Sequence, residues 1–202
     1  MDEQPNEKKN PTEQVRRAGN SHLVTSGESN WKDFFRFTLI ALAIVIPFRI
    51  FIAQPFMVSG ASMSPTFESG QYLIVDEISY RLESPARGDV IILKKPRQES
   101  EYLIKRIVGL PGETVIINDG AVSVKESGNG KETAINEPYV KNKSAENSEY
   151  DLGEDEYFVM GDNRPVSLDS RFIGPVPKDH IVGRAFIRLF PVNKLSVLPG
   201  HY

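Results

Sequence analysis

Cysteine is absent from this chain of 202 residues. Its absence excludes disulfide bonds, zinc–thiolate sites and catalysis by a thiol nucleophile. The compartment stays open, because an exported domain can also stand without disulfides. A large excess of positive charge is absent as well: the formal net charge is −3. Nucleic-acid-binding domains are strongly basic, so no nucleic-acid partner is expected.

Histidine is nearly as scarce, with three residues in the whole chain. His22 falls in a polar N-terminal stretch and His201 is penultimate, so only His180 could enter a site; its plain interpretation is a surface or turn histidine. A Ser-His-Asp triad is therefore poorly supported. Asp162 and Asp169 have neither a histidine nor a third acid nearby, so no metal or other cofactor is expected.

The N-terminal part of the chain contains one long apolar run. Residues 1–32 are rich in Asn, Glu, Gln, Ser and Lys, a composition typical of a flexible tail. From Phe34 to Ala53 there are 20 residues with only two arginines, both near the ends, which is enough for one bilayer crossing. We therefore predict a transmembrane anchor over residues 33–54.

A buried core helix and a cleaved signal peptide are the alternatives for this run. Cleavage after Ala53 would place bulky Phe51 where a small residue is needed, with Pro55 just beyond, so an uncleaved anchor is favoured. Lysines and arginines precede the run, and the positive-inside rule places that side in the cytoplasm. We expect a single-pass protein of the lipid bilayer whose chain from Gln54 onward lies on the outer, extracytoplasmic face.

Residues 55–202 have the pattern of a mainly β domain. Short runs of β-branched and aromatic residues, such as "GDVIILKKP" and "ETVIINDGAVSVK", are separated by Gly, Pro, Asn and Asp. The "NDGA" segment between two alternating runs is typical of a hairpin turn. Residues 125–153 are polar and are expected to form a small surface excursion. The chain has no internal repeat.

The stretch "SGASMSPTF", residues 59–67, follows the apolar run and offers three serines. A serine hydroxyl is a poor nucleophile unless a base takes its proton. Gly60 and Ala61 have almost no side-chain bulk, so the backbone beside Ser62 could approach a reacting oxygen closely with an exposed amide N–H. A linker turn leaving the membrane is the plain alternative.

Because a suitable histidine is missing, a lysine is the alternative base. A solvated lysine has a pKa of about 10.4, so it can act as a base near neutral pH only where that pKa is lowered, by an apolar, water-poor site or by a neighbouring cation. In "YLIKRIVGLPGE", strand alternation puts Leu103, Lys105 and Ile107 on one face. A strand lysine that reaches out to water is the structural alternative, and Lys94 and Lys95 stay open as other candidates.

A third stretch, "GDNRPVSLDSR", covers residues 161–171 and is dense in charged and polar side chains. Because buried charges must be paired, this density between two apolar runs predicts a buried polar network or a site. A well-solvated charged loop is the alternative.

In their order, the apolar run, "SGASMSPT", "RGDVIIL", "KRIVGLPGE" and "GDNRPVSLDSR" closely resemble the bacterial type I signal peptidases over about Phe34 to Phe190. These are membrane-bound Ser-Lys endopeptidases. The resemblance implies an antiparallel β-sheet catalytic domain of signal-peptidase type, preceded by one transmembrane helix and resting on the membrane surface. It implies that the substrates are signal peptides of exported preproteins, cut after small residues in an A-x-A-like pattern.

The resemblance also implies roles for single residues. Ser62 matches the nucleophile and Lys105 matches the general base. Ser167 matches a serine that hydrogen-bonds and orients this lysine.

Two charged pairs match supporting positions. Asp169 and Arg171 match a salt-bridged pair beside the site, and Asp162 matches a partner for Arg106.

We expect the signal peptide to bind as an extended strand between residues 55–60 and 102–105, adding to their edges. The residues expected to contact it or to line pockets for small side chains are Val58, Ser59, Gly60, Met63, Phe67, Leu103 and Ile104.

The sequence departs from the family pattern at two places. Gly60 stands where some members have a serine whose hydroxyl helps to bind the oxyanion, so the Ser62 amide would need other help, for example from Ser59. Pro165 and Val166 stand where polar residues are usual, and we expect them to stiffen the third stretch.

Two other functions fit parts of the pattern. A self-cleaving Ser-Lys regulator of the SOS-repressor kind would need a DNA-binding domain where this chain has its apolar run. A membrane-anchored β domain that only binds exported chains would not need the intact pair Ser62 and Lys105.

Overall fold

The computed structural model describes residues 29–51, 54–126 and 130–201. The chain divides into two units, with the boundary between Ala43 and Ile44. Most of the predicted tail, residues 1–28, lies outside the described residues. The predicted domain boundaries at residues 32 and 54 stay predictions.

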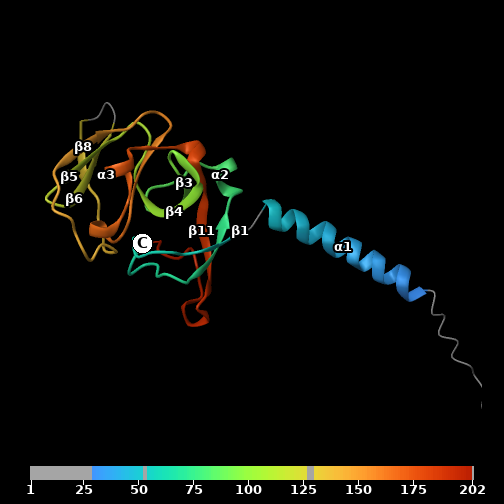
Figure 1. Ribbon diagram of the computed structural model, residues 1–202. Helices are drawn as coiled ribbons and strands as arrows, with labels where there is room; N and C mark the ends of the chain where they lie inside the picture. The colour runs from blue at the N-terminus through green and yellow to red at the C-terminus, as the bar shows by residue number, and fades with distance from the viewer. Residues whose placement is uncertain (1–28, 52–53, 127–129, 202) are drawn as a thin grey trace, which may run out of the picture. The chain divides into compact units, whose positions relative to one another are not determined.

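Helix α1 spans Ser29–Phe51 and has 23 residues (Figure 1). Large apolar side chains along its described part are exposed, among them Phe37 and Leu39 at 74% and 70%. In the described part of the chain, no helix combines the length and the apolar character that crossing a membrane requires. The anchor over residues 33–54, two of which (52–53) lie outside the described residues, stays a prediction.

The residues after α1 fold mainly into antiparallel β-strands, as the sequence predicts. Within the described residues the larger sheet has eight strands. In the order of pairing, these are β1 (Gln54–Met57), β2 (Tyr72–Asp76), β11 (Ile181–Phe190), β3 (Val90–Lys95), β4 (Gln98–Gly109), β9 (Glu156–Met160) and β10 (Val176–Pro177), with β12 (Ser196–Val197) beside β11.

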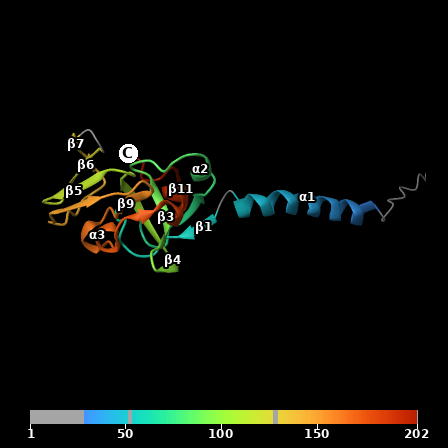
Figure 2. The same cartoon turned by 90° about the horizontal axis from the view of Figure 1, so that it is seen from above.

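A smaller sheet lies at the end of this β domain that is opposite β1 and β11 (Figures 1 and 2). In the described part of the chain its four strands are β7 (Glu132–Ala134), β6 (Ala121–Lys125), β5 (Thr114–Asn118) and β8 (Ser148–Asp151). The expected hairpin joins β5 to β6 through Asp119 and Gly120, whose φ angles of 48° and 72° suit a type I′ turn. The polar segment 125–153 is more than a surface excursion, because it supplies β7 and β8.

The remaining elements are short. They are the helices α2 (Ser79–Leu82) and α3 (Ser170–Ile173) and the 3₁₀ turns η3 (Arg164–Val166), η4 (Lys178–His180) and η5 (Val192–Lys194).

Strand β3 is buried on both faces, which explains the unbroken apolar run "VIIL". Val90 and Ile92 pack in one buried cluster, while Ile91 and Leu93 pack in another on the opposite face. The register pairs Ile91 with Lys105 of β4. Because the middle of β4 pairs with the buried part of β3, Lys105 lies in the interior.

Candidate active site

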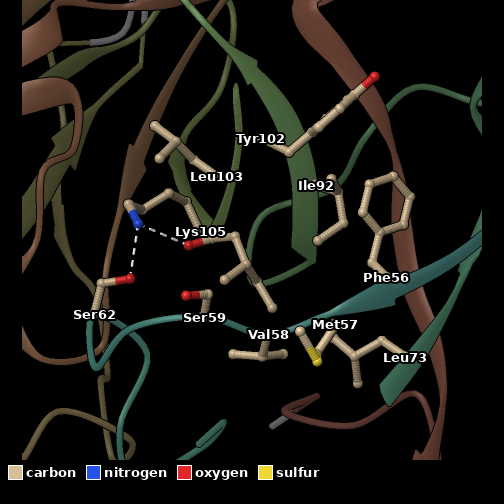
Figure 3. A pocket seen from close by; sticks show the side chains of 11 residues that line it. Phe56, Met57, Val58, Ser59, Ser62, Leu73, Ile92, Tyr102, Leu103 and Lys105 are labelled. Carbon is tan, nitrogen blue, oxygen red and sulfur yellow. Dashed lines mark hydrogen bonds between the residues drawn. The ribbon is translucent and has the colours of Figure 1, made fainter. Parts of the chain in front are cut away.

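Ser62 and Lys105, which are 43 residues apart in the chain, meet in the structure (Figure 3). Lys105 Nζ donates a hydrogen bond of 2.9 Å to Ser62 Oγ and one of 2.8 Å to the carbonyl oxygen of Ile104. The lysine is 2% exposed, so it does not reach out to water. The alternative candidate Lys95 pairs instead with Glu101 at the surface, and neither Lys94 nor Lys95 lines the pocket beside Ser62.

Burial lowers the pKa of the Lys105 ammonium to about 8, because a water-poor site disfavours the charged form. The carboxylates of Asp169 and Asp162 act in the opposite direction and raise this pKa. Near pH 8 a large fraction of Lys105 is therefore the neutral amine, which can accept the proton of a hydroxyl group.

The segment that carries Ser62 is held by the third motif. The Asn163 amide N–H donates to the Ser62 carbonyl oxygen at 2.9 Å, and its side-chain amide donates to the Ala61 carbonyl oxygen at 3.1 Å. Gly161 must be a glycine, because a Cβ there would lie 2.5 Å from the Ser62 carbonyl oxygen and 2.2 Å from Ser167 Oγ. Two loops about a hundred residues apart in sequence are thus packed backbone to backbone.

Gly60 is constrained by its backbone conformation rather than by space. Its φ of +92° lies in the region that residues with a side chain rarely adopt, while an added Cβ would meet nothing within 4 Å. A serine in this backbone conformation would therefore be strained.

Arg106 and Asp162 form the pair that the resemblance implies. Arg106 Nε and Nη2 donate to the two carboxylate oxygens of Asp162 at 2.9 and 2.7 Å, and both side chains are 1% exposed. Thr66 Oγ1 donates to the same carboxylate at 2.5 Å. The guanidinium also donates to the carbonyl oxygen of Gly88 and stacks 3.9 Å from the ring centroid of Tyr139.

Asp169 and Arg171 form the second pair, with Nε–Oδ1 and Nη2–Oδ2 distances of 2.8 and 2.9 Å. The Asp169 carboxylate also accepts the Gly161 amide N–H at 3.0 Å. Arg164 is buried too and pairs with Glu137. The third motif is therefore a buried, paired network, and the interpretation as a solvated loop is wrong.

Ser167 lies against the site, but its expected bond to the lysine is not seen. It is 4% exposed, and within the described residues its hydroxyl has no hydrogen-bond partner. The bonds of the Lys105 ammonium go to Ser62 and Ile104 instead. The expected stiffening of the loop has a local counterpart, since Pro165 and Val166 belong to the 3₁₀ turn η3.

A small pocket of about 100 Å³ opens beside the Ser62–Lys105 pair (Figure 3). Val58, Ser59, Leu103 and Ile104 line it, as expected from the sequence. Phe56, Met57 and Tyr102 also line it and belong to the two segments expected to flank the peptide, although they were not singled out, whereas Leu73 and Ile92 were missed. Strand alternation from Val58 and Ile104 could have found Phe56 and Tyr102, but no local signal indicates Leu73 or Ile92 on other strands.

Three residues expected to contact substrate lie elsewhere. Met63 and Phe67 are 1% and 0% exposed and pack in the core cluster beneath the pocket, because large apolar side chains next to a buried strand gain most from leaving water. Gly60 is exposed but is not part of the lining. His180 is also outside the lining, in η4.

Two open strand edges flank the pocket. Among the described strands, β1 pairs with β2 alone, and residues 102–105 of β4 pair with β3, whereas pairing with β9 begins at Arg106. An extended peptide between these edges could hydrogen-bond to both strands. Among the described residues, no group of three His, Asp or Glu side chains could hold a metal ion.

The chain is similar to known proteins over most of its length. The family model "Signal peptidase, peptidase S26" matches residues 31–190. The probable signal peptidase I-2 of Synechocystis sp. is 34% identical, over 93% of this chain and 86% of that protein. Signal peptidase I of Leptolyngbya laminosa is also 34% identical, over 95% and 96%. A crystal structure of a signal peptidase I from Enterococcus faecalis is 28% identical and covers 50% of this chain and 97% of its own, with a TM-score of 0.44.

The Arg106–Asp162 pair gives a prediction for stability. Asp162→Asn leaves the buried guanidinium without its counter-charge, so the free energy of unfolding should fall by about 3–5 kcal/mol. Glu101→Gln is the matched control, since it breaks an exposed pair with Lys95 and should change stability by less than about 1 kcal/mol. Urea unfolding followed by circular dichroism measures both; equal effects would contradict the assigned role of the buried pair.

Proposed function

This chain belongs to the signal peptidase family, peptidase S26, and on that premise we propose that Ser62 and Lys105 are the nucleophile and general base with which it removes signal peptides from exported preproteins. The observation that carries this proposal is the 2.9 Å hydrogen bond between Lys105 Nζ and Ser62 Oγ in a site where the lysine is almost fully buried. Burial supplies the low pKa that the base needs, and the hydrogen bond supplies the path of the proton.

The reaction proceeds in two halves. Neutral Lys105 takes the proton of Ser62 Oγ as this oxygen attacks the scissile carbonyl carbon. The resulting ammonium gives the proton to the leaving amine, so the peptide C–N bond breaks and an acyl-enzyme ester remains. In the second half Lys105 takes a proton from water as the water oxygen attacks the ester carbonyl carbon. The ammonium then gives this proton to Ser62 Oγ as the ester C–O bond breaks, which releases the signal peptide and restores both residues.

The developing oxyanion requires donors on the side of the carbonyl opposite Lys105. We assign the backbone N–H of Ser62 and the hydroxyl of Ser59 to this role. Ser59 lines the pocket, and Figure 3 shows its hydroxyl directed toward the side where Ser62 lies. The positive φ of Gly60 places these two serines around a sharp backbone bend.

The signal peptide binds as an extended strand between the open edges of β1 and β4. Its side chains alternate, so every second one enters the pocket. The pocket is small and its walls are mostly apolar side chains, which suits small apolar side chains and supports cleavage after small residues in an A-x-A-like pattern.

We also propose that residues 33–54 anchor the protein in the lipid bilayer, with the N-terminus in the cytoplasm and the β domain on the extracytoplasmic face. The support is the apolar run between Phe34 and Ala53, the preceding lysines and arginines, and the exposed apolar side chains of α1.

Substitution of the two reacting residues tests the mechanism. Ser62→Ala and Lys105→Ala should each lower kcat for cleavage of a preprotein by about three orders of magnitude or more, because each removes one half of a catalytic unit. Lys105→His should be equally inactive if an amine is needed in this geometry. Ser64→Ala is the matched control, two residues from Ser62 and outside the pocket lining, and should keep full activity.

Full activity of the Ser62→Ala or the Lys105→Ala variant would contradict the proposed mechanism. Covalent labelling of Ser62 by a β-lactam-like acylating inhibitor separates an enzyme from a domain that only binds exported chains.

The pH dependence follows from the lowered pKa of Lys105. Only the neutral amine is a base, so kcat/KM should rise with pH through an apparent pKa of about 8 and level off above it. Initial rates of peptide cleavage across this range measure the profile. A profile without an ascending limb near this pH would argue against Lys105 as the base.

Membrane attachment has its own test. In isolated membranes the full chain should resist extraction by alkaline carbonate. Protease added on the extracytoplasmic side should digest the β domain and leave a short N-terminal fragment intact. Release of the intact chain by carbonate would rule out a spanning anchor.

A further inference from the structure

The end of the pocket farthest from Ser62 and Lys105 is closed by two aromatic rings (Figure 3). The ring centroids of Phe56 and Tyr102 are 5.3 Å apart and the planes meet at 67°, an edge-to-face contact. Both rings line the pocket.

This contact crosses the cleft rather than following the sheet. Phe56 lies on β1 and Tyr102 on β4, and three strands, β2, β11 and β3, lie between them in the order of pairing. Neighbouring strands are about 4.8 Å apart, so rings this close require the sheet to curve until its β1 edge faces β4. The two rings therefore bridge the same open edges that the proposed substrate strand would occupy.

Strand periodicity identifies the substrate position that meets this bridge. Val58 and Ile104 lie beside the reacting pair, and Phe56 and Tyr102 are two residues further along on the same faces. Side chains two residues apart on a strand are about 6.6 Å apart. If the last residue before the cut contacts Val58 and Ile104, the third residue before the cut therefore meets the two rings, while the residue between them points away.

The two rings differ in how far they are buried. Phe56 is partly buried and packs against the core cluster beneath the pocket, so it is fixed from behind. Tyr102 is 47% exposed and lines the pocket, so its ring has one side in solvent. Of the two, Tyr102 can be removed without opening a hole in the core.

We propose that the ring of Tyr102, held against Phe56, is the stop that limits the size of the third residue before the cut. The inference rests on the proposed function and deepens it, because it assigns the selection at one substrate position to one residue. An alanine side chain fits beneath the bridged rings, whereas a leucine side chain must break their contact to enter.

The experiment uses the full chain in detergent and two fluorogenic peptides that differ only at this position, with Ala-Gln-Ala or Leu-Gln-Ala before the cut. Mass spectrometry of the products verifies the cut site. The measured quantity is the ratio of kcat/KM for the alanine peptide to that for the leucine peptide. The unsubstituted chain should favour the alanine peptide by about tenfold or more.

Three variants isolate the ring. Tyr102→Ala should lower the ratio by about tenfold, mainly by raising kcat/KM for the leucine peptide. Tyr102→Phe keeps the ring and should keep the ratio. Tyr72→Ala is the matched control: Tyr72 is 46% exposed and contacts Phe190, but it does not line the pocket, so its loss should leave the ratio unchanged.

An unchanged ratio in Tyr102→Ala, with the alanine peptide still cut, would overturn the inference and leave the proposed function standing. Equal loss of selection in Tyr102→Ala and Tyr72→Ala would overturn it too, since the effect would not belong to the pocket. Failure of the unsubstituted chain to cut the alanine peptide would overturn the proposed function and this inference with it.

Discussion

The burial of Lys105 sets the requirements that the groups around the site meet. A lysine base has to lose its proton, and burial makes this easier for Lys105 by lowering the pKa of its ammonium to about 8. Two nearby carboxylates, Asp162 and Asp169, oppose this effect by favouring the ammonium. Each is held by a bidentate bond to an arginine, Arg106 or Arg171, which neutralises its charge and satisfies its oxygens. The ion pairs are therefore part of how the site keeps a neutral amine beside buried acids.

Close backbone packing contributes to this burial. The loop that carries Ser62 and the loop that carries Asp162 are in direct contact through two hydrogen bonds of Asn163, which helps to shield the buried lysine from water. Gly161 permits this approach because it has no side chain, and Gly60 permits the bend that precedes the nucleophile because its φ is positive. On the other side, two strand edges beside the cleft are free of pairing among the described residues, and an extended peptide can add there.

Much of this could be predicted from local sequence. Alternation and turn residues indicated a β domain and the hairpin at Asp119 and Gly120, and the density of charge in residues 161–171 indicated paired, buried groups. Met63 and Phe67 could not be placed, because the pattern that marks a pocket-lining apolar residue is the same as the pattern that marks a core residue. Tyr139 was not predicted as part of the site for a related reason. Its partner, Arg106, is distant in sequence, and the polar residues around Tyr139 do not indicate which group its ring contacts.

Local sequence alone established a chain without cysteine or a usable histidine, a strand with a lysine among aliphatic residues, and a glycine and an alanine just before a serine. The tertiary structure decided which of these meet. Pairing of β4 with the buried strand β3 carries Lys105 inside, and the curvature of the sheet brings Phe56 across the cleft to Tyr102. The physical reason is that periodicity fixes only which face of an element a side chain occupies. Desolvation, and with it the pKa of Lys105, depends on neighbours that come from distant parts of the chain.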